Sequence, residues 1–314
     1  MEDRKRAVRE TIRTSMDNYS FLKWLSCEVR FNEQMKNHTS FKTGGDAELM
    51  VFPEEVSDIR VLIDNSRKRK IPIFIIGGGT NLIVRDGGIR GMVINMQRLN
   101  RVTMMDDTLL YVESGLSLPR LVRYCQKKGL SGMESATGIP GSVGGAIMMN
   151  AGIQGWEISS ILDSIKIVDR YGLIRVIKRD GAGFTYRGSH IPAGIIIGGL
   201  FRLKKADISE SESLIRERLA HRKERQPIRD HSAGCIFKNP SGYSAGRLIE
   251  EVGLKGYRIG DAEVSKRHAN FIINKGSASS KDIISLIRYI GKRIEEEMGI
   301  TLELEVKVVG REGR

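Results

Sequence analysis

The 314-residue sequence predicts an α+β protein that is large enough for two or three domains. Three observations support this fold class. From about residue 40, short β-like runs alternate with glycines, and near Ala206 the composition becomes polar and charged. The last third combines two helical patterns with a final alternating strand. We therefore expect three segments, at residues 1–39, 40–204 and 205–314.

The N-terminal segment carries a basic amphipathic pattern over residues 1–30, which predicts a helix followed by a link. Met1 is followed by five charged residues and no apolar stretch, so we expect no signal peptide. The longest apolar runs, residues 71–76 and 193–201, are far shorter than the roughly 20 residues that cross a bilayer. We expect no membrane association.

The central segment alternates predicted strands with two predicted helices. The first helix follows Pro53, and the second begins near Ser117 and ends at Gly129. A glycine-rich stretch occupies residues 138–155. Strands are predicted at residues 47–52, 71–76, 82–84, 92–96, 102–105, 109–112, 161–168, 173–178 and 194–203.

The C-terminal segment predicts helices over residues 209–225, 244–252 and 280–298. Ser279 and Asp282 form the pattern of a capping box before the last helix, and Gly299 is placed to end it. Apolar and polar residues then alternate strictly over residues 301–309, which predicts a strand.

Cysteine usage and charge restrict the function classes. Cys27, Cys125 and Cys235 are far apart and form no metal-ligand spacing, so we expect no disulfide framework and no metal site, in keeping with a reducing cytosol. The net charge of +13 suits nucleic acid, small phosphorylated ligands, or a merely basic surface. Because the cations are dispersed and aromatic residues make up only 6%, we expect no nucleic-acid partner.

Two glycine-rich segments could approach phosphate groups through their backbone N–H groups. The first, residues 77–81, follows an apolar strand, although a plain β-turn is an equally open interpretation. A strand-like run follows it where a Rossmann fold would have a helix. The second, residues 136–146, is entropically costly to order and so favours a ligand-wrapping loop over a flexible turn.

Four further segments carry side chains that could take part in chemistry. The loop at residues 234–240 combines Cys235 with a cation and an amide, and its Gly and Pro suggest exposure, whereas most free cysteines are core residues. Arg187 can bind a carboxylate in a bidentate manner, unless it is simply solvated. Glu305 would by default be a solvated strand carboxylate, and His268 a structural hydrogen-bonding residue.

Taken in chain order, these segments resemble the UDP-N-acetylenolpyruvoylglucosamine reductase (MurB) family, flavoenzymes of bacterial peptidoglycan synthesis. The matching segments are residues 37–45, 77–86, 138–150, 186–189, 234–240, 245–256, 268–274 and 302–310.

The resemblance implies a two-lobed FAD-binding domain of the vanillyl-alcohol-oxidase (PCMH) type over residues 40–204, and a smaller α+β substrate-binding domain over residues 205–314. It implies that NADPH reduces FAD, and that hydride transfer to C3 and protonation at C2 convert UDP-N-acetyl-3-O-(1-carboxyvinyl)glucosamine to UDP-N-acetylmuramate. It further implies a cytoplasmic enzyme, expected to be a monomer, that serves cell wall biogenesis, cell shape and cell division.

The resemblance also implies residue roles. Arg187 would hold the substrate carboxylate, Cys235 would donate the proton to C2, and Glu305 would assist with the enolate. The candidate substrate ligands are Tyr186, Arg225, Lys238, Asn239 and His268. The candidate FAD ligands are Gly77, Gly78, Gly79, Thr80, Asn81, Leu82, Thr137, Gly138, Ile139, Pro140, Gly141, Gly144, Gly145, Asn150, Ala151 and Gly152.

Two features depart from the family's best-known pattern. Cys235 stands where serine is usual, and its thiol can still donate a proton because its reference pKa is near 8.5. No tyrosine lies between Tyr186 and His221, so the chain resembles the compact subgroup that lacks a substrate-covering tyrosine loop. The alternatives are another FAD-dependent oxidoreductase with this fold and, from a different class, a basic nucleic-acid-binding protein.

Overall fold

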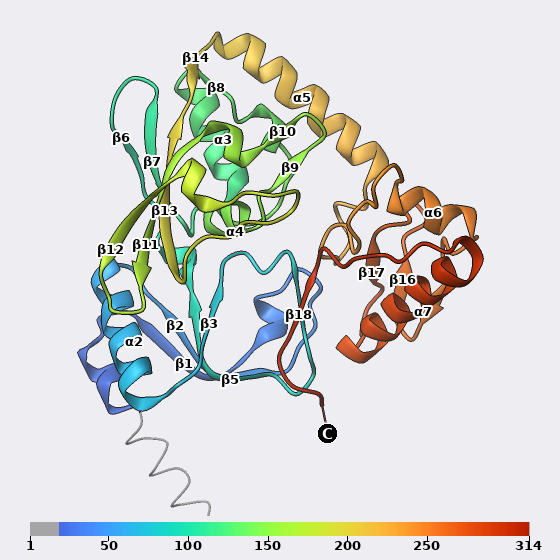
Figure 1. The fold of residues 1–314 in the computed structure, drawn as a ribbon, viewed down its shortest axis with the longest axis horizontal. Helices are drawn as coiled ribbons and strands as arrows, with labels where there is room; N and C mark the ends of the chain where they lie inside the picture. Colours follow the sequence, from blue (N-terminus) through green and yellow to red (C-terminus); the bar gives the residue numbers. More distant parts are fainter. Residues whose placement is uncertain (1–18, 314) are drawn as a thin grey trace, which may run out of the picture.

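The computed structural model describes residues 19–313, which form two lobes and a C-terminal part (Figure 1). Most of the predicted N-terminal helix falls on residues 1–18, outside the described residues. The described chain starts with a 3₁₀-helix, Ser20–Trp24, and continues into strand β1, Glu28–Gln34. The predicted helix and link are therefore wrong at residues 28–30, because pairing with β2 holds this charged segment extended.

The first lobe is a sheet with strand order β1-β2-β5-β3. β1 pairs antiparallel with β2, whereas β2 and β3 both run parallel to β5. A parallel connection needs a crossover, and α2 supplies it between β2 and β3 with Ile59 and Leu62 buried. The bounds are β2 Asp46–Phe52, α2 Val56–Arg69, β3 Ile73–Ile76 and β5 Ile89–Asn95.

The second lobe is an antiparallel sheet with strand order β12-β11-β13-β7-β6. Two helices cover it, and Leu110, Ile147 and Phe201 lie in their shared core. The short helix α4 within the glycine-rich stretch was not predicted. The bounds are β6 Val102–Met104, β7 Leu109–Glu113, α3 Leu118–Lys127, β8 Leu130–Ser131, α4 Val143–Met148, β9 Gly152–Ile153, β10 Trp156–Glu157, β11 Leu162–Asp169, β12 Ile174–Lys178, β13 Gly194–Arg202 and β14 Lys204–Lys205.

Helix α5, Ile208–Arg225, runs from the second lobe to the C-terminal part, where α6 and α7 pack on a sheet of order β15-β16-β17 (Figure 1). The capping box predicted for α7 is confirmed, because Ser279 Oγ accepts from Asp282 N and Asp282 Oδ2 accepts from Ser279 N. Gly299 ends the helix with a φ of 69°. The bounds are α6 Ala245–Glu251, β15 Arg258–Ile259, β16 Ala262–Val264, β17 Ile272–Asn274 and α7 Ser280–Met298.

The last strand returns to the first lobe. β18, Lys307–Val309, runs parallel to β4, Leu82–Val84 (Figure 1). The strand predicted over residues 301–309 is therefore wrong for residues 301–306. Within them, only Leu304 forms an antiparallel bridge, with Phe237, in which Lys238 N donates to Glu303 O and Glu305 N donates to Ile236 O. The chain then bends at residues 305–306 before it pairs with β4.

Contacts between parts also fix the C-terminal part to the first lobe. Phe41 and Ile83 belong to the hydrophobic core of the C-terminal part. Asp86 accepts hydrogen bonds from Ser280 N at 3.0 Å and Lys281 N at 3.3 Å, so a first-lobe carboxylate caps α7. Among the described residues, no helix is long and apolar enough to cross a membrane.

We predict that Asp86→Ala lowers the free energy of unfolding by about 1 kcal/mol, because two N–H groups at the start of α7 lose their acceptor. Denaturant unfolding measures the change. The exposed Asp107, which pairs with Lys205 on the surface, gives the control Asp107→Ala, expected to unfold like the unsubstituted protein. Equal stability of the two variants would show that the cap contributes nothing.

Candidate functional site

The two glycine-rich segments lie against each other although about sixty residues separate them in the chain. A Cβ on Gly77 would lie 2.0 Å from Ser142 Oγ, and one on Gly78 would lie 3.0 Å from Gly141 Cα. Thr80 Oγ1 donates to Pro140 O at 3.4 Å. Only glycines allow this approach of the two segments, which meet where the lobes join. We call residues 77–81 and 136–146 together the glycine cradle.

The first segment is also tied to the end of the chain. Gly79 has a φ of 62°, and a Cβ there would lie 1.9 Å from His38 O. Asn81 Nδ2 donates to Glu305 O at 3.1 Å, and Asn81 O accepts from Lys307 N at 3.0 Å. The cradle and Glu305 are therefore parts of one hydrogen-bonded unit, with Leu82 opening β4 beside it.

Two buried hydroxyl groups lie in or next to the second glycine-rich segment, residues 136–146. Thr137 Oγ1 and Ser114 Oγ are enclosed and have no hydrogen-bond partner within residues 19–313. Ser114 O accepts from Gly144 N at 2.8 Å, so both hydroxyls belong to this loop region. Buried polar groups are almost always hydrogen-bonded, and these two fit a polar ligand such as the expected FAD.

Other residues predicted to bind the cofactor hold the second glycine-rich segment and the neighbouring turn in place. Asn150 Nδ2 donates to Glu157 Oε2 at 2.7 Å and to Thr185 O at 3.0 Å, so its side chain holds the turn that carries Arg187. Gly145 N donates to Ser142 Oγ at 3.3 Å. Ile139 packs on the second-lobe core, and Ala151 and Gly152 lead into β9.

Arg187, in the second lobe, and Glu305, just before β18, form an ion pair with Arg187 Nε 3.0 Å from Glu305 Oε1. Both side chains are about one-fifth exposed, at 19% and 20%. Arg187 has a φ of 56°, an unusual backbone conformation for a residue with a side chain. Hydrogen bonds between Thr185 and Gly188 close the turn that holds it there. Strain of this kind is concentrated at functional sites.

Cys235 lies in an extended segment between the segment that contains Phe271 and the segment that contains Glu305. It bridges Phe271 on one side, and the next residue accepts from Glu305 N at 2.8 Å on the other. Asn270, which we did not predict, donates to Phe237 O at 2.8 Å and accepts from Phe237 N at 2.9 Å. The predicted exposed loop is therefore wrong at Cys235: the residue is half-buried because its backbone is paired on both sides.

Burial and charge set the protonation states in this cluster. Burial, reinforced by the charge of Glu305, raises the pKa of the Cys235 thiol to about 12, against the opposing effect of Arg187 and Arg222. Burial also raises the pKa of Glu305, although Arg187 and Lys238 favour its charged form. The thiol is therefore held protonated at neutral pH and can act as an acid.

The other predicted substrate ligands differ in their exposure and in the groups that they contact. Lys238 Nζ lies 2.5 Å from Glu303 Oε1, and Asn239 Oδ1 accepts from Ala245 N at 3.0 Å. The ring of Tyr186 is about half exposed, with its centroid 5.1 Å from Arg187 Cζ. Arg225 is exposed at the end of α5.

The contacts of His268 favour a structural role over direct substrate binding. Its Nδ1 accepts from Asn270 N at 3.3 Å, and its ring packs edge-on against Phe271 at 4.9 Å. Burial lowers the pKa of the imidazole, so it is held neutral. We infer that His268 orients the segment beside Cys235.

Arg222 belongs to the cluster and was not predicted. It is half-buried, and its position is close enough to Cys235 and Arg187 for their charges to act on its pKa. The sequence did hold a signal, because Ser211, Ile215, Arg218 and Arg222 recur at helical spacing and would share the inward face of α5.

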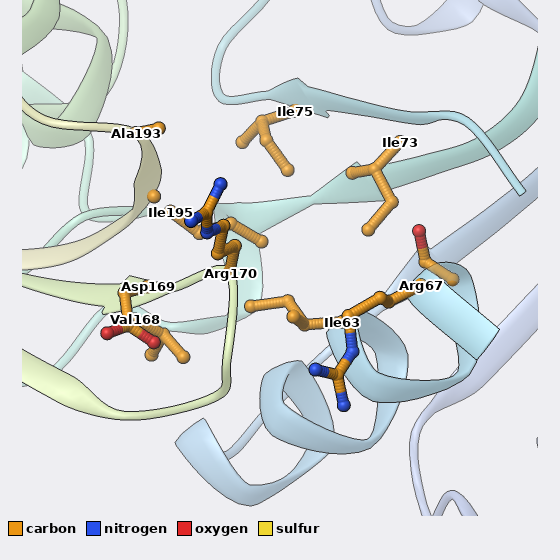
Figure 2. A pocket seen from close by; sticks show the side chains of 11 residues that line it. Ile63, Arg67, Ile73, Ile75, Val168, Asp169, Arg170, Ala193 and Ile195 are labelled. Carbon is orange, nitrogen blue, oxygen red and sulfur yellow. The ribbon is translucent and has the colours of Figure 1, made fainter. Parts of the chain in front are cut away.

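An apolar groove of about 340 Å³ lies elsewhere, between α2, β3, β11 and β13. Figure 2 shows Ile63, Ile73 and Ile75 turned toward it, with Arg67 and Arg170 among its lining. Its lining contains none of the cradle or ion-pair residues, so the groove is separate from the cluster around Arg187 and Glu305. Within residues 19–313, no group of three or more His, Cys, Asp or Glu side chains could hold a metal ion.

Comparison with known proteins identifies similar chains. The family described as UDP-N-acetylenolpyruvoylglucosamine reductase, C-terminal domain, matches residues 226–309, and the FAD binding domain family matches residues 47–178. UDP-N-acetylenolpyruvoylglucosamine reductase from Clostridium tetani is 43% identical over 286 residues, covering 90% of this chain and 93% of that protein. The protein of the same name from Clostridium novyi is 42% identical over 287 residues, covering 91% and 93%.

Among solved structures, the crystal structure of UDP-N-acetylenolpyruvylglucosamine reductase (MurB) from Thermus caldophilus is similar along nearly its whole length. It superposes with a TM-score of 0.77 at 36% identity, covering 90% of this chain and 99% of that chain. The predicted α+β fold class, with an FAD-binding domain and a smaller C-terminal domain, is confirmed.

We predict that iodoacetamide alkylates Cys235 roughly a thousandfold more slowly at pH 8 than it alkylates an ordinary thiol, because only thiolate reacts. Glu305→Gln should accelerate the reaction, since it removes the charge that raises the thiol pKa. Peptide mass spectrometry after timed alkylation measures each cysteine separately. Glu303→Gln, two residues earlier and largely exposed, is the control and should leave the rate unchanged. Fast alkylation of the unsubstituted protein at pH 8 would contradict the raised pKa.

Proposed function

The chain belongs to the UDP-N-acetylenolpyruvoylglucosamine reductase family, a family of flavin-dependent oxidoreductases, and from this premise we propose its reaction and the roles of its residues. The reaction is NADPH-dependent reduction of UDP-N-acetyl-3-O-(1-carboxyvinyl)glucosamine to UDP-N-acetylmuramate. The observation that carries the proposal is the convergence of Arg187, Glu305 and Cys235 beside the double glycine cradle.

The cradle would hold FAD. Gly77, Gly78 and Gly141 let the two glycine-rich segments lie against each other, and backbone N–H groups of such segments suit a pyrophosphate. The hydroxyls of Thr137 and Ser114 supply unused hydrogen-bonding groups. When bound, FAD supplies to C3 of the enolpyruvyl group the hydride that it has received from NADPH.

Arg187 would bind the substrate carboxylate. Its guanidinium offers donors in a fixed plane, and one of them is already held by Glu305. As C3 gains a hydride, negative charge passes through C2 into the carboxylate, and a fixed cation stabilises that charge more than it stabilises the ground state. The strained turn and Asn150 keep Arg187 in place for this task.

Cys235 would donate its proton to C2. Burial and the charge of Glu305 keep the thiol protonated, so the acid is ready when the carbanion forms. The resulting thiolate is unstable in this environment and is reprotonated from solvent. Glu305 therefore acts on both partners, because it pairs with Arg187 and raises the thiol pKa.

The remaining proposals concern binding and location. Tyr186, Lys238, Asn239 and Arg225 are the candidate contacts to the sugar nucleotide, with Arg225 available to the diphosphate from the exposed end of α5. The protein would work in the cytoplasm as a monomer, in cell wall biogenesis. No insertion with a second tyrosine separates Tyr186 from β13, so the substrate would be covered as in the compact subgroup.

An anaerobic absorbance titration tests the function. Flavin bands of the purified protein should bleach with NADPH and return when the enolpyruvyl sugar nucleotide is added, because that substrate takes up the electrons. Bands that bleach but do not return would leave an FAD oxidoreductase with another substrate. A protein that carries no flavin and binds none would overturn the proposal.

We predict that Cys235→Ser keeps substantial activity, whereas Cys235→Ala lowers turnover of the enolpyruvyl substrate by roughly 10²- to 10⁴-fold. Serine still offers a proton at this position and alanine does not. Stopped-flow absorbance separates the two half-reactions, and both variants should show flavin reduction by NADPH at the unsubstituted rate. Full turnover in the alanine variant would exclude Cys235 as the proton donor.

We predict that Arg187→Ala lowers turnover by about 10²- to 10³-fold without loss of bound FAD, because it removes the cation at the developing charge. Steady-state kinetics and the flavin content of the purified variant measure these effects. Arg179→Ala is the matched control, since Arg179 lies in the same lobe but pairs with Asp180 on the surface. A variant that lost only FAD would assign Arg187 to the cofactor instead.

A further inference from the structure

Helix α5 presents two half-buried arginines without acidic partners among the described residues. Within residues 19–313, neither Arg218 nor Arg222 forms an ion pair, and Arg218 Nε is buried without a hydrogen-bond partner. The described hydrogen bond of the Arg222 guanidinium is a long one, from Nη1 to Gln226 Oε1 at 3.5 Å. The exposed Arg216 of the same helix, by contrast, pairs with Glu212 one turn away.

Arg222 lies between the cradle and the proton donor. A Cβ on Gly138 would lie 2.7 Å from Arg222 Cδ and 3.5 Å from its Nε, so the side chain packs directly on the second glycine-rich segment. The charged groups that act on the guanidinium are Arg187, Arg218 and Cys235 when it is ionised. Two of the three are cations that repel it, and the third is protonated at neutral pH.

The end of α5 is held firmly in this position. Arg267, from the loop before β17, donates through Nη1 to Lys223 O at 2.9 Å and to Gln226 O at 3.4 Å. Both carbonyls follow Arg222 in sequence, Lys223 in the last turn of the helix and Gln226 at its C-cap. The partial negative charge of a helix C-terminus favours a cation there, but it does not replace a counterion.

The charge balance of the cluster then points to an absent anion. Arg187 shares its charge with Glu305, so the pair is close to neutral, whereas the charge on Arg222 is uncompensated. A desolvated cation without a partner is costly to maintain, and a guanidinium cannot escape the cost by losing its proton. Such an arrangement is stabilised when an anion enters the site.

We propose that Arg222 is a second anion-binding residue of the reaction site, and that it binds a planar, delocalised oxyanion at the meeting point of the glycine cradle and Cys235. This inference rests on the proposed function. Two sources offer that chemistry, the carboxylate of the enolpyruvyl substrate and the anionic form of reduced FAD. Arg222 would act together with Arg187, with Arg218 adding charge from one helical turn away.

The experiment compares Arg222→Met with Arg216→Met in the flavin-loaded protein. Both variants remove one charge from α5, but Arg216 is exposed and lies outside the site. Titration of the flavin spectrum of the oxidised protein with the enolpyruvyl sugar nucleotide gives the dissociation constant. Spectroelectrochemistry gives the midpoint potential of the flavin and shows whether its reduced form is anionic.

If the substrate carboxylate is the ligand, Arg222→Met weakens substrate binding by about ten- to a hundredfold with the flavin potential unchanged, as expected for loss of a charge-assisted bond. If the reduced flavin is the ligand, the midpoint potential becomes more negative and substrate affinity is retained. Arg222→Lys should recover part of either effect, because it restores the charge without the planar donor set.

Equality of Arg222→Met with Arg216→Met in affinity, potential and thermal unfolding would overturn the proposal. If the methionine variant does not fold, Arg222→Gln is measured by the same titrations, with the same outcomes expected. Failure of the proposed function is recognised separately, because the unsubstituted protein would then not bind the enolpyruvyl sugar nucleotide. In that case the potential of the bound flavin still decides whether Arg222 meets an anion.

Discussion

The parallel pairing of β18 with β4 is the constraint on which the site depends. It brings the end of the chain back to a strand more than two hundred residues earlier, next to the first glycine-rich segment. Asn81 links the two directly, because its side chain donates to Glu305 O and its backbone accepts from Lys307 N. Without this closure, Glu305 would not face Arg187, and the cradle would not adjoin the reactive side chains.

The ion pair of Arg187 with Glu305 has more than a stabilising role. Glu305 also contributes to the raised pKa of the Cys235 thiol, so one carboxylate both pairs with Arg187 and disfavours the thiolate. Burial raises the pKa of both acidic groups, and low local dielectric strengthens each charge effect. Burial likewise desolvates the Arg222 guanidinium, which has no acidic partner among the described residues, and this is the basis of the proposed anion site.

Asparagine side chains elsewhere in the chain hold the backbone beside Arg187 and Cys235. Arg187 occupies a left-handed backbone conformation in a tight turn, and Asn150, itself at a φ of 44°, holds the carbonyl of Thr185 behind it. Asn270 performs the equivalent task for the Cys235 segment by bonding both backbone groups of Phe237. Two buried amides thus fix the reactive residues without taking part in the chemistry themselves.

The sequence by itself determined the local elements and the residue types of the site. Ser279 with Asp282 and Gly299 delimited α7, because capping depends on neighbours within one turn. The glycines of both cradle segments were likewise recognisable, since only they permit such backbone approach. The tertiary structure decided the extended pairing of β1, the bend that turns Glu305 inward, and the inward position of Arg222. These depend on contacts between residues far apart in the chain, and strict alternation over residues 301–309 carries no information about which partner each half will pair with.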